Sequence, residues 1–269
     1  MDYAKGLSSV MKTNSQISFL IFLFLLGSLS LTISGCSSKK VNEGNPEEVF
    51  NDAEDDIKDK HFLSALEKMK TVKNKFPYSA FSTKASLRVA DIYFLEESFV
   101  EAAATYEAFQ DLHPKYEKAD YVVFQIGESY FNQLPGGIDR DLTPATKAYE
   151  AYTQLEKLYP QSEYLAKARD QGKRALNQLA LKERYIADFY FKQDMYDSAA
   201  SRYEKITKKY PGTETDEFAY DRWSTCLIRL NKGDEAKHVL KVYLNRYPSG
   251  SYASSAAKQL KSLEMKEVH

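Results

Sequence analysis

The sequence feature that most constrains the fold is an alanine followed at a fixed distance by a proline. In each of five such pairs the proline lies 12 residues after the alanine. A small residue lets two helices approach closely, and proline ends a helix because it lacks a backbone donor and restricts the residue before it. The spacing therefore predicts one repeated helical unit ending at each proline: Ala65/Pro77, Ala102/Pro114, Ala148/Pro160, Ala199/Pro211 and Ala236/Pro248.

A second set of residues assigns these units to a known kind of repeat. A large side chain follows each alanine by four residues, one helical turn later, where it fills the space beside the small residue. Upstream segments such as Ala90-Asp91-Ile92-Tyr93 keep a small residue with a tyrosine three positions later. This combination resembles the tetratricopeptide repeat, a two-helix unit of about 34 residues. We therefore expect an all-α tetratricopeptide-repeat solenoid of five helix-turn-helix repeats with a long connecting helix; a generic helical bundle is the alternative.

Two departures from the regular period predict where the solenoid is interrupted. Residues 133–144 form an insertion in the third repeat, where Thr143 and Pro144 are typical of an N-cap followed by proline at the first helical position. Residues 162–192 contain no proline and one glycine, so we expect one long helix or two nearly collinear ones. The predicted domains are repeats one to three (47–161) and a second part with the connecting helix, repeats four and five and a closing helix (162–264).

The first 35 residues have the pattern of a secretory signal peptide. Lys12 precedes a nearly unbroken apolar run from Ile17 to Leu26. The run Ile33-Ser34-Gly35-Cys36 resembles the lipobox of bacterial lipoproteins, which implies that Cys36 is lipidated and anchors the chain in a membrane through acyl chains. A transmembrane helix is the alternative, but a bilayer requires about 20 apolar residues and this run is shorter. The polar residues 36–46 are expected to form a flexible tether.

Charge and motif content argue against several classes of function. The leader carries one acid and two bases, so the formal charge of −1 becomes −2 in the mature chain, which disfavours general nucleic-acid binding. The four histidines have no metal-ligand spacing, and neither a P-loop nor a Gly-x-Ser-x-Gly elbow is present. We therefore expect no enzymatic activity, no cofactor and no metal. Lipidation of Cys36 leaves Cys226 as a single thiol, which cannot form an internal disulfide.

The first helix of each repeat supplies a candidate binding surface, because first helices line the concave face of such solenoids. Apolar, aromatic and acidic residues fall on one stripe in repeats two and three, and exposed apolar groups are typical of binding surfaces. Packing in the core is the alternative, since i, i+3, i+4 spacing serves both roles. The candidate client-peptide groove, which we expect to face solvent, consists of Leu87, Asp91, Phe94, Leu95, Tyr121, Phe124, Glu128 and Phe131.

The lipobox, the five repeats, the insertion and the long connector together resemble the BamD/ComL family of the outer-membrane β-barrel assembly machine. The resemblance is carried by Asp139-Arg140-Asp141 in the insertion and by the segments 159–164 and 210–213. It implies a non-enzymatic scaffold that is lipid-anchored to the outer membrane, on its periplasmic face.

The same resemblance implies protein partners. The C-terminal repeats are expected to dock on a POTRA domain of BamA, together with other Bam lipoproteins, and the N-terminal repeats to bind unfolded outer-membrane barrel proteins. Partner coupling is assigned by resemblance to Phe189, Tyr190 and Arg202. The alternative is another tetratricopeptide lipoprotein adaptor, such as a secretin pilotin or a cell-envelope division factor.

Overall fold

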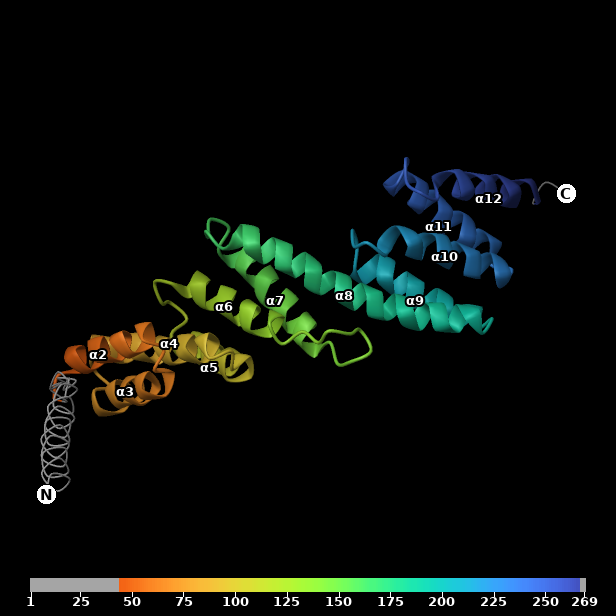
Figure 1. Cartoon of the computed structure of the whole chain (residues 1–269). Helices are drawn as coiled ribbons and strands as arrows, with labels where there is room; N and C mark the ends of the chain where they lie inside the picture. Colours follow the sequence, from red (N-terminus) through yellow and green to blue (C-terminus); the bar gives the residue numbers. More distant parts are fainter. Residues whose placement is uncertain (1–43, 267–269) are drawn as a thin grey trace, which may run out of the picture. The chain divides into compact units, whose positions relative to one another are not determined.

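The computed structural model describes residues 44–266, and its regular elements there are α-helices (Figure 1). They form five helix-turn-helix units and a closing helix, which confirms the predicted all-α tetratricopeptide-repeat solenoid. The leader, Cys36 and the tether as far as residue 43 lie outside the described residues. The helices are α2 (Pro46–Lys58), α3 (Phe62–Lys75), α4 (Ala80–Leu95), α5 (Phe99–Leu112), α6 (Ala119–Phe131), α7 (Thr143–Leu158), α8 (Leu165–Lys192), α9 (Tyr196–Lys209), α10 (Asp216–Arg229), α11 (Gly233–Arg246) and α12 (Ala253–Lys266).

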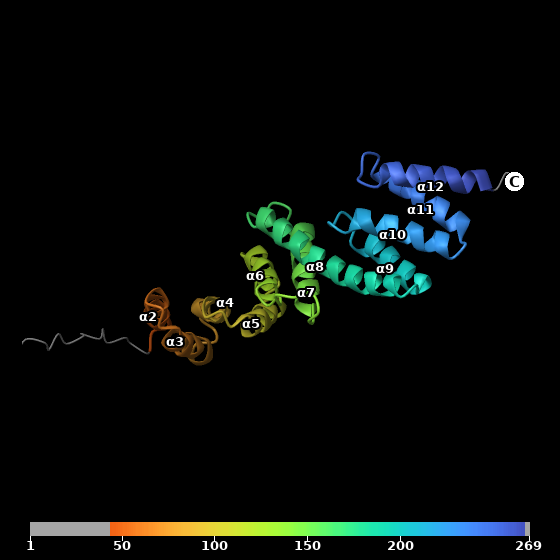
Figure 2. The same ribbon diagram turned by 45° about the vertical axis from the view of Figure 1, so that its right-hand side comes forward.

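The sequence repeat sets the register in which the helices pack. Each unit pairs a first helix with a second, as Figure 2 shows for α6 with α7 and for α10 with α11. The alanines of the five pairs are completely buried on the second helices, and the large residues four positions later are also buried. Small residues thus permit close helix contact and large ones fill the space beside them. The buried large residues are Met69, Tyr106, Tyr152, Tyr203 and Leu240.

Most units turn from the first helix to the second through one residue with a left-handed backbone. In the described range this residue is Lys60, Glu97, Asp194 or Asn231, with φ between 57 and 60°. A residue in this conformation commonly ends an α-helix, because it redirects the chain and lets following N–H groups bond the last carbonyls. In repeat three, the insertion between α6 and α7 replaces this turn.

Short polar side chains fix several helix starts. The Asn45 side chain accepts from the N–H of Glu47 at 3.0 Å, so α2 begins at Pro46, the last residue assigned to the tether. The expectation that Thr143 caps α7 is wrong, because Thr143 is itself the first helical residue. Asp141 takes that role: its Oδ1 accepts from the Thr143 N–H at 3.1 Å and from the Thr143 hydroxyl at 2.8 Å. An acceptor two residues upstream reaches the free N–H groups of the first turn.

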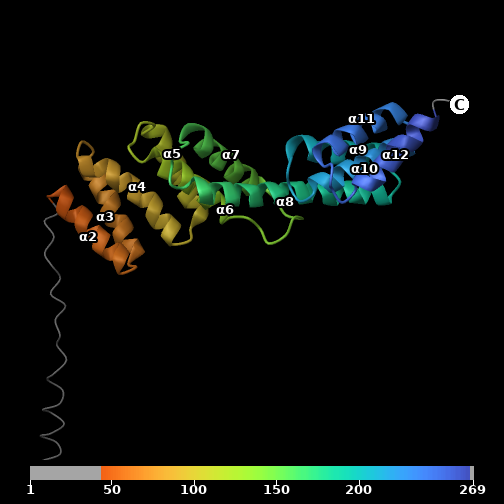
Figure 3. The same cartoon turned by 90° about the horizontal axis from the view of Figure 1, so that it is seen from above.

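A single helix, α8, connects repeats three and four, which decides between the two expectations for this segment. It has 28 residues and spans about 42 Å at 1.5 Å per residue. Near its start Leu165 and Ala168 join the core around α7, and near its end Ala187 joins the core of α9 and α10. Figure 3 shows α8 continuing from α7 to α9 without a break. The Lys182 Nζ also donates to the Arg140 carbonyl at 2.7 Å, which fixes the insertion against α8.

Candidate functional site

A cleft of about 590 Å³ lies across the first helices of the N-terminal repeats. It is termed the N-terminal cleft and is formed by α2, α4, the loop between α5 and α6, the start of α6 and the loop before α8. The lining mixes aromatic groups with cations and carboxylates, which suits a peptide carrying both apolar and polar groups. The lining residues are Phe50, Lys84, Leu87, Arg88, Asp91, Tyr116, Glu117, Lys118, Asp120, Tyr121, Glu163 and Tyr164.

Asp91 ties three repeats together at the floor of this cleft. It is buried, and its Oδ1 accepts from the hydroxyls of Tyr106 at 2.6 Å and Tyr121 at 2.8 Å. Its Oδ2 accepts from Arg88 Nη1 at 2.8 Å. The same guanidinium donates from Nε and Nη2 to the two oxygens of Glu54 on α2, at 2.6 and 2.8 Å. Each charge in this network therefore has an opposite charge or a hydroxyl donor beside it, as burial requires.

The electrostatics of the network hold its two tyrosines and its arginine in one protonation state. Burial and the neighbouring Asp91 carboxylate raise the pKa of the Tyr106 and Tyr121 hydroxyls. Burial lowers the pKa of Arg88, but its hydrogen bonds to Glu54 and Asp91 outweigh that effect, so the net change is upward. Both tyrosines remain donors and Arg88 remains a cation at neutral pH, which gives the cleft a fixed polar floor.

Glu128 of α6 is a second buried carboxylate that links neighbouring helices, here α6 with α7 and α8. It is buried on α6, where Oε1 accepts from the Tyr152 hydroxyl at 2.7 Å and Oε2 pairs with Lys167 Nζ of α8 at 2.7 Å. The Phe124 ring stacks on Tyr164, with ring centroids 4.8 Å apart and planes inclined by 15°. The Lys167 ammonium lies 5.3 Å from the centroid of Phe124. These contacts hold Tyr164 at the edge of the N-terminal cleft.

The expectation that the eight candidate groove residues face solvent is wrong for four of them. The second helix of each unit covers this part of α4 and α6, as the tyrosine hydroxyls that reach Asp91 and Glu128 show. Leu95 is exposed, and the remaining three candidates are half-buried. The four buried side chains, between 3 and 7% exposed, are Leu87, Asp91, Phe124 and Glu128.

The structure brings only part of the candidate groove together. Phe94 packs on Phe99 at the turn into α5, with ring centroids 5.3 Å apart. Phe131, at the end of α6, lies 5.1 Å from the guanidinium carbon of Arg174. Neither of them lines the N-terminal cleft. The candidates that do line it are Leu87, Asp91 and Tyr121.

Sequence reasoning missed cleft residues that come from loops and from neighbouring repeats. Tyr116 and Tyr164 each follow a helix-ending proline within four positions, which is a signal that the sequence did contain. Phe50 lies on α2, where no groove residue was expected. The exposed cations Lys84 and Lys118 have ordinary surface character in the sequence, and only the fold places them at one cleft.

The three candidate coupling residues do not form one cluster: Phe189 contacts Tyr190, and Arg202 contacts Glu183. Phe189 is 58% exposed near the end of α8, and its ring lies 5.7 Å from that of the half-buried Tyr190. Arg202, on α9, instead donates from Nη1 to Glu183 Oε2 at 3.0 Å. Lys205 pairs with the other oxygen of this buried carboxylate. The side chain of Arg202 is still 38% exposed.

Two findings on the described residues concern metal binding and thiol reactivity. Within residues 44–266, no group of three or more His, Cys, Asp or Glu side chains is arranged to hold a metal ion. Cys226 is buried, and burial raises the pKa of its thiol to about 12, so it stays protonated and weakly nucleophilic. In the same range, no helix has both the length and the apolar character needed to cross a bilayer.

Known proteins resemble this chain over most of its length. The family model described as "YfiO: Outer membrane lipoprotein" matches residues 42–225. A Neisseria gonorrhoeae protein named "Outer membrane protein assembly factor BamD" is 25% identical over 251 residues, covering 87% of this chain and 94% of the relative. A Vibrio cholerae protein of the same name is 28% identical over 202 residues, covering 71% and 84%. Among solved structures, the "TPR2AB-domain:pHSP90-complex of yeast Sti1" shares 16% identity at a TM-score of 0.39, covering 82% and 90%, which is too distant to inform function.

Proposed function

Because the chain belongs to the YfiO family of outer membrane lipoproteins, whose model matches residues 42–225, we propose that it is a non-enzymatic scaffold for the assembly of outer-membrane proteins. The relatives from Neisseria and Vibrio are both named as outer membrane protein assembly factors. The alignment with the Neisseria relative covers 87% of this chain and 94% of the relative. That coverage supports transferring the role of the whole protein and not of a shared domain alone.

The N-terminal cleft is the observation that carries the proposal. We propose that it receives an extended segment of an unfolded outer-membrane barrel protein. Apolar side chains of the segment would pack on Phe50, Leu87 and Tyr164, while Lys84 and Lys118 at the rim would meet its polar groups. Binding should be weak, because ordering a flexible peptide offsets much of the contact free energy. Weak binding suits a scaffold that must release its client.

Repeats four and five are proposed to dock on the POTRA domain of BamA, with other Bam lipoproteins in the same complex. The exposed ring of Phe189 offers apolar surface of the kind that marks protein contacts. Arg202 adds a half-exposed cation on α9, and Tyr190 supports the ring of Phe189 from α8.

A lipid anchor at Cys36 is proposed to hold the scaffold on the periplasmic face of the outer membrane. Each buried methylene contributes about 0.8 kcal/mol, so several acyl chains make the attachment essentially permanent. Replacing the thiol in a Cys36→Ser variant should leave unprocessed precursor and move mature protein into the soluble periplasmic fraction. Normal processing and membrane retention of this variant would contradict the anchor.

Site-specific crosslinking tests the client cleft. A photoreactive amino acid in place of Lys84, at the cleft, should capture the last strand of an unfolded barrel protein. The same amino acid in place of Leu63, which is 71% exposed on α3 and does not line the cleft, is the matched control and should capture far less. Equal capture at the two positions would exclude the cleft as the client site. Co-purification of a secretin instead of a POTRA-containing barrel protein would favour the pilotin alternative.

A further inference from the structure

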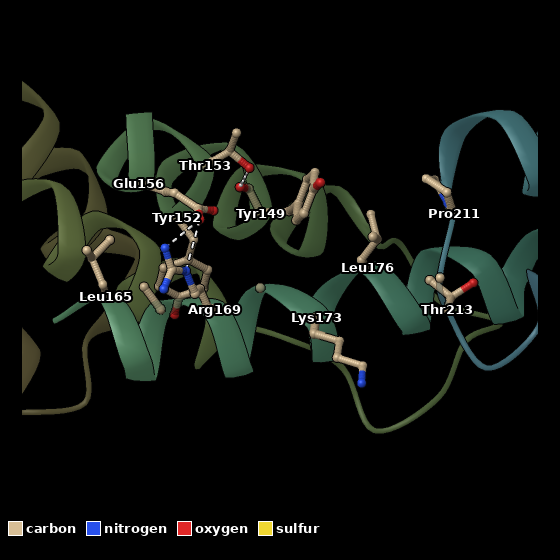
Figure 4. A pocket seen from close by; sticks show the side chains of 13 residues that line it. Tyr149, Tyr152, Thr153, Glu156, Leu165, Arg169, Lys173, Leu176, Pro211 and Thr213 are labelled. Carbon is tan, nitrogen blue, oxygen red and sulfur yellow. Dashed lines mark hydrogen bonds and ion pairs between the residues drawn. The ribbon is translucent and has the colours of Figure 1, made fainter. Parts of the chain in front are cut away.

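A second cleft, termed the junction cleft, lies where repeat three meets repeat four (Figure 4). Its volume is about 350 Å³, toward the lower end of the roughly 300–1,000 Å³ typical of ligand pockets. Helix α7 forms one wall, α8 forms the floor, and the loop from Pro211 to Thr213 forms the other wall. Figure 4 shows the Leu176 side chain between the Tyr149 ring and Pro211. One apolar spot of the cleft therefore lies at this end, and Leu165 lines the other end.

The interruption of the repeat period explains why this cleft is open. In repeats one, two and four, the residue directly after the packing alanine is buried: Leu66, Ala103 and Ala200 are 1–8% exposed. The corresponding residue in repeat three is Tyr149, which is half-exposed and lines the junction cleft. Because α8 is 28 residues long, the core of α9 and α10 forms around Ala187, near its far end. The α7 face that regular stacking would bury is left accessible.

The loop on the far side of the cleft is held in place by specific contacts. Asn177 of α8 and Glu214 exchange two hydrogen bonds of 3.2 Å, one in each direction. Gly212 has a φ of +73°, a conformation that favours glycine, and its N–H donates to the buried Asp216 carboxylate at 2.7 Å. The cleft is thus preformed, and a ligand does not have to order the loop.

The charges at the junction cleft are mainly positive. Arg169 and Lys173 line it against one carboxylate, Glu156. Arg169 already pairs with Glu156 at 2.8 Å, but both side chains are more than half exposed, so the pair is weak and can exchange. Lys173 forms no ion pair within residues 44–266, and the nearby Glu214 carboxylate is directed to Asn177. By contrast, the N-terminal cleft is lined by four carboxylates and three cations.

We propose that the junction cleft binds a short acidic segment of a partner protein. The segment inserts one or two apolar side chains among Tyr149, Leu176 and Pro211 and places a carboxylate beside Lys173. Shape and charge both favour this occupant. The apolar spot accommodates only one or two side chains, and Lys173, which forms no ion pair within residues 44–266, lines the same cleft. The inference does not rest on the client role proposed for the N-terminal cleft, which has different residues and the opposite balance of charge.

The experiment uses the full mature chain with labelled leucine methyl groups and three hexapeptide probes. DELFDE is acidic with an apolar centre, KKLFKK carries the opposite charge, and DEGGDE lacks the apolar centre. Nuclear magnetic resonance should show DELFDE shifting the methyl signals of Leu176 and Leu165, with saturation in the millimolar range. KKLFKK and DEGGDE should bind at least about tenfold more weakly, since each lacks one of the two complementary features.

Variants at exposed lysines locate the charge contact. Lys173→Glu should weaken DELFDE binding at least about tenfold, because it turns attraction into repulsion. Lys147→Glu makes the same charge change on an exposed residue of α7 that does not line the cleft, and it should change binding less than twofold. The proposal is overturned if DELFDE does not bind, if its shifts map to the N-terminal cleft, if KKLFKK binds as well, or if both variants behave alike. None of these outcomes bears on client crosslinking at Lys84, so failure of this inference and failure of the proposed function are distinguishable.

Discussion

Two buried carboxylates on first helices, Asp91 in repeat two and Glu183 in repeat four, are neutralised in different ways. Asp91 accepts from two tyrosine hydroxyls and shares Arg88 with a carboxylate of α2. Glu183 is paired with two cations of α9, Arg202 and Lys205, whose side chains are 38 and 33% exposed. The Asp91 network adds two neutral hydroxyls to an ion pair whose side chains, Arg88 and Glu54, are 27 and 26% exposed. The Glu183 network relies on cations alone, and these are somewhat more exposed.

This difference separates a rigid site from one that can exchange partners. Neutral hydroxyl donors in a buried network strengthen one another and gain nothing by turning to solvent. Cations that are a third exposed are well solvated when released, so a partner carboxylate competes for them at little cost. Asp91 therefore belongs to the preformed floor of the N-terminal cleft, whereas Arg202 is suited to the coupling role proposed for repeats four and five.

The largest effect should come from removing Asp91. An Asp91→Ala variant leaves Arg88 without part of its counter-charge and removes the acceptor of the buried Tyr106 and half-buried Tyr121 hydroxyls. We expect the free energy of unfolding to fall by about 3 kcal/mol. Urea denaturation followed by circular dichroism measures this loss. Asp91→Asn keeps an acceptor but not the charge and should lose about half as much. A loss below about 1 kcal/mol for Asp91→Ala would show that Arg88 and the two tyrosines do not depend on Asp91 for their stabilising contacts.

Packing across repeats three and four should give the next largest effect. Ala148 and Ala199 are completely buried at equivalent positions, so Ala148→Leu or Ala199→Leu should overpack its repeat and lower the free energy of unfolding by about 1–3 kcal/mol. Ala104→Leu, at an exposed position of α5, is the matched control and should be nearly neutral. If neither buried variant lowers thermal stability, the repeat register assigned to these alanines is incorrect.

The repeat register was predictable because its determinants are local in sequence. A small residue, a large residue one turn later and a proline at a fixed distance specify the second helix of each unit without knowledge of its neighbours. The same local logic located the insertion and the long connector, although it placed the α7 cap on Thr143 when Asp141 provides it. Asp141 instead satisfies the N–H of Thr143 from two residues upstream, and the Thr-Pro spacing does not indicate this.

The exposed face of the first helices was not predictable in the same way. The sequence pattern predicts that Asp91 and Glu128 face solvent. In the structure both are buried, and they accept hydrogen bonds from the hydroxyls of Tyr106 and Tyr152. Those tyrosines lie 15 and 24 residues away in sequence, and a helical period carries no information about such a partner. The cleft itself depends on loops such as that holding Tyr116, whose position is set by packing between repeats.

Removing the charge of Glu183 should have a smaller effect than removing Asp91. In a Glu183→Gln variant, Arg202 and Lys205 can turn to water, so we expect a loss of about 1 kcal/mol in the free energy of unfolding. A double-mutant cycle with Arg202→Ala measures how much of this loss belongs to that ion pair. If Glu183→Gln lost as much stability as Asp91→Ala, the cations at Glu183 would be no easier to release to water than the partners of Asp91, and the proposed difference between the two networks would be wrong.

Two half-buried tyrosines, Tyr130 in repeat three and Tyr247 at the end of repeat five, should have effects of similar or smaller size, and they allow the two regions to be compared at alkaline pH. Tyr130 donates to Glu107 at 2.9 Å, and Tyr247 donates to Asp216 at 2.6 Å. Burial, followed by the carboxylate acceptor, raises the pKa of both hydroxyls to about 12, above the usual value of about 10. Between those two pH values the unfolded chain has released protons that the folded chain retains, so stability should fall as pH rises through this window.

Replacing each tyrosine by phenylalanine separates the two sites. Tyr130→Phe and Tyr247→Phe should each lower stability at neutral pH by about 0.5–1.5 kcal/mol and make the alkaline decline less steep. The loss of stability at neutral pH should be larger for Tyr247→Phe. The acceptor of Tyr247, Asp216, is fully buried, and its Oδ1 already has no hydrogen-bond partner within residues 44–266. The acceptor of Tyr130, Glu107, is only half-buried and can be rehydrated. Urea denaturation at pH values from neutral to strongly alkaline measures both quantities. Tyr78→Phe removes a fully exposed hydroxyl and serves as the control; an unchanged alkaline slope in both test variants would show that these hydroxyls do not govern the decline.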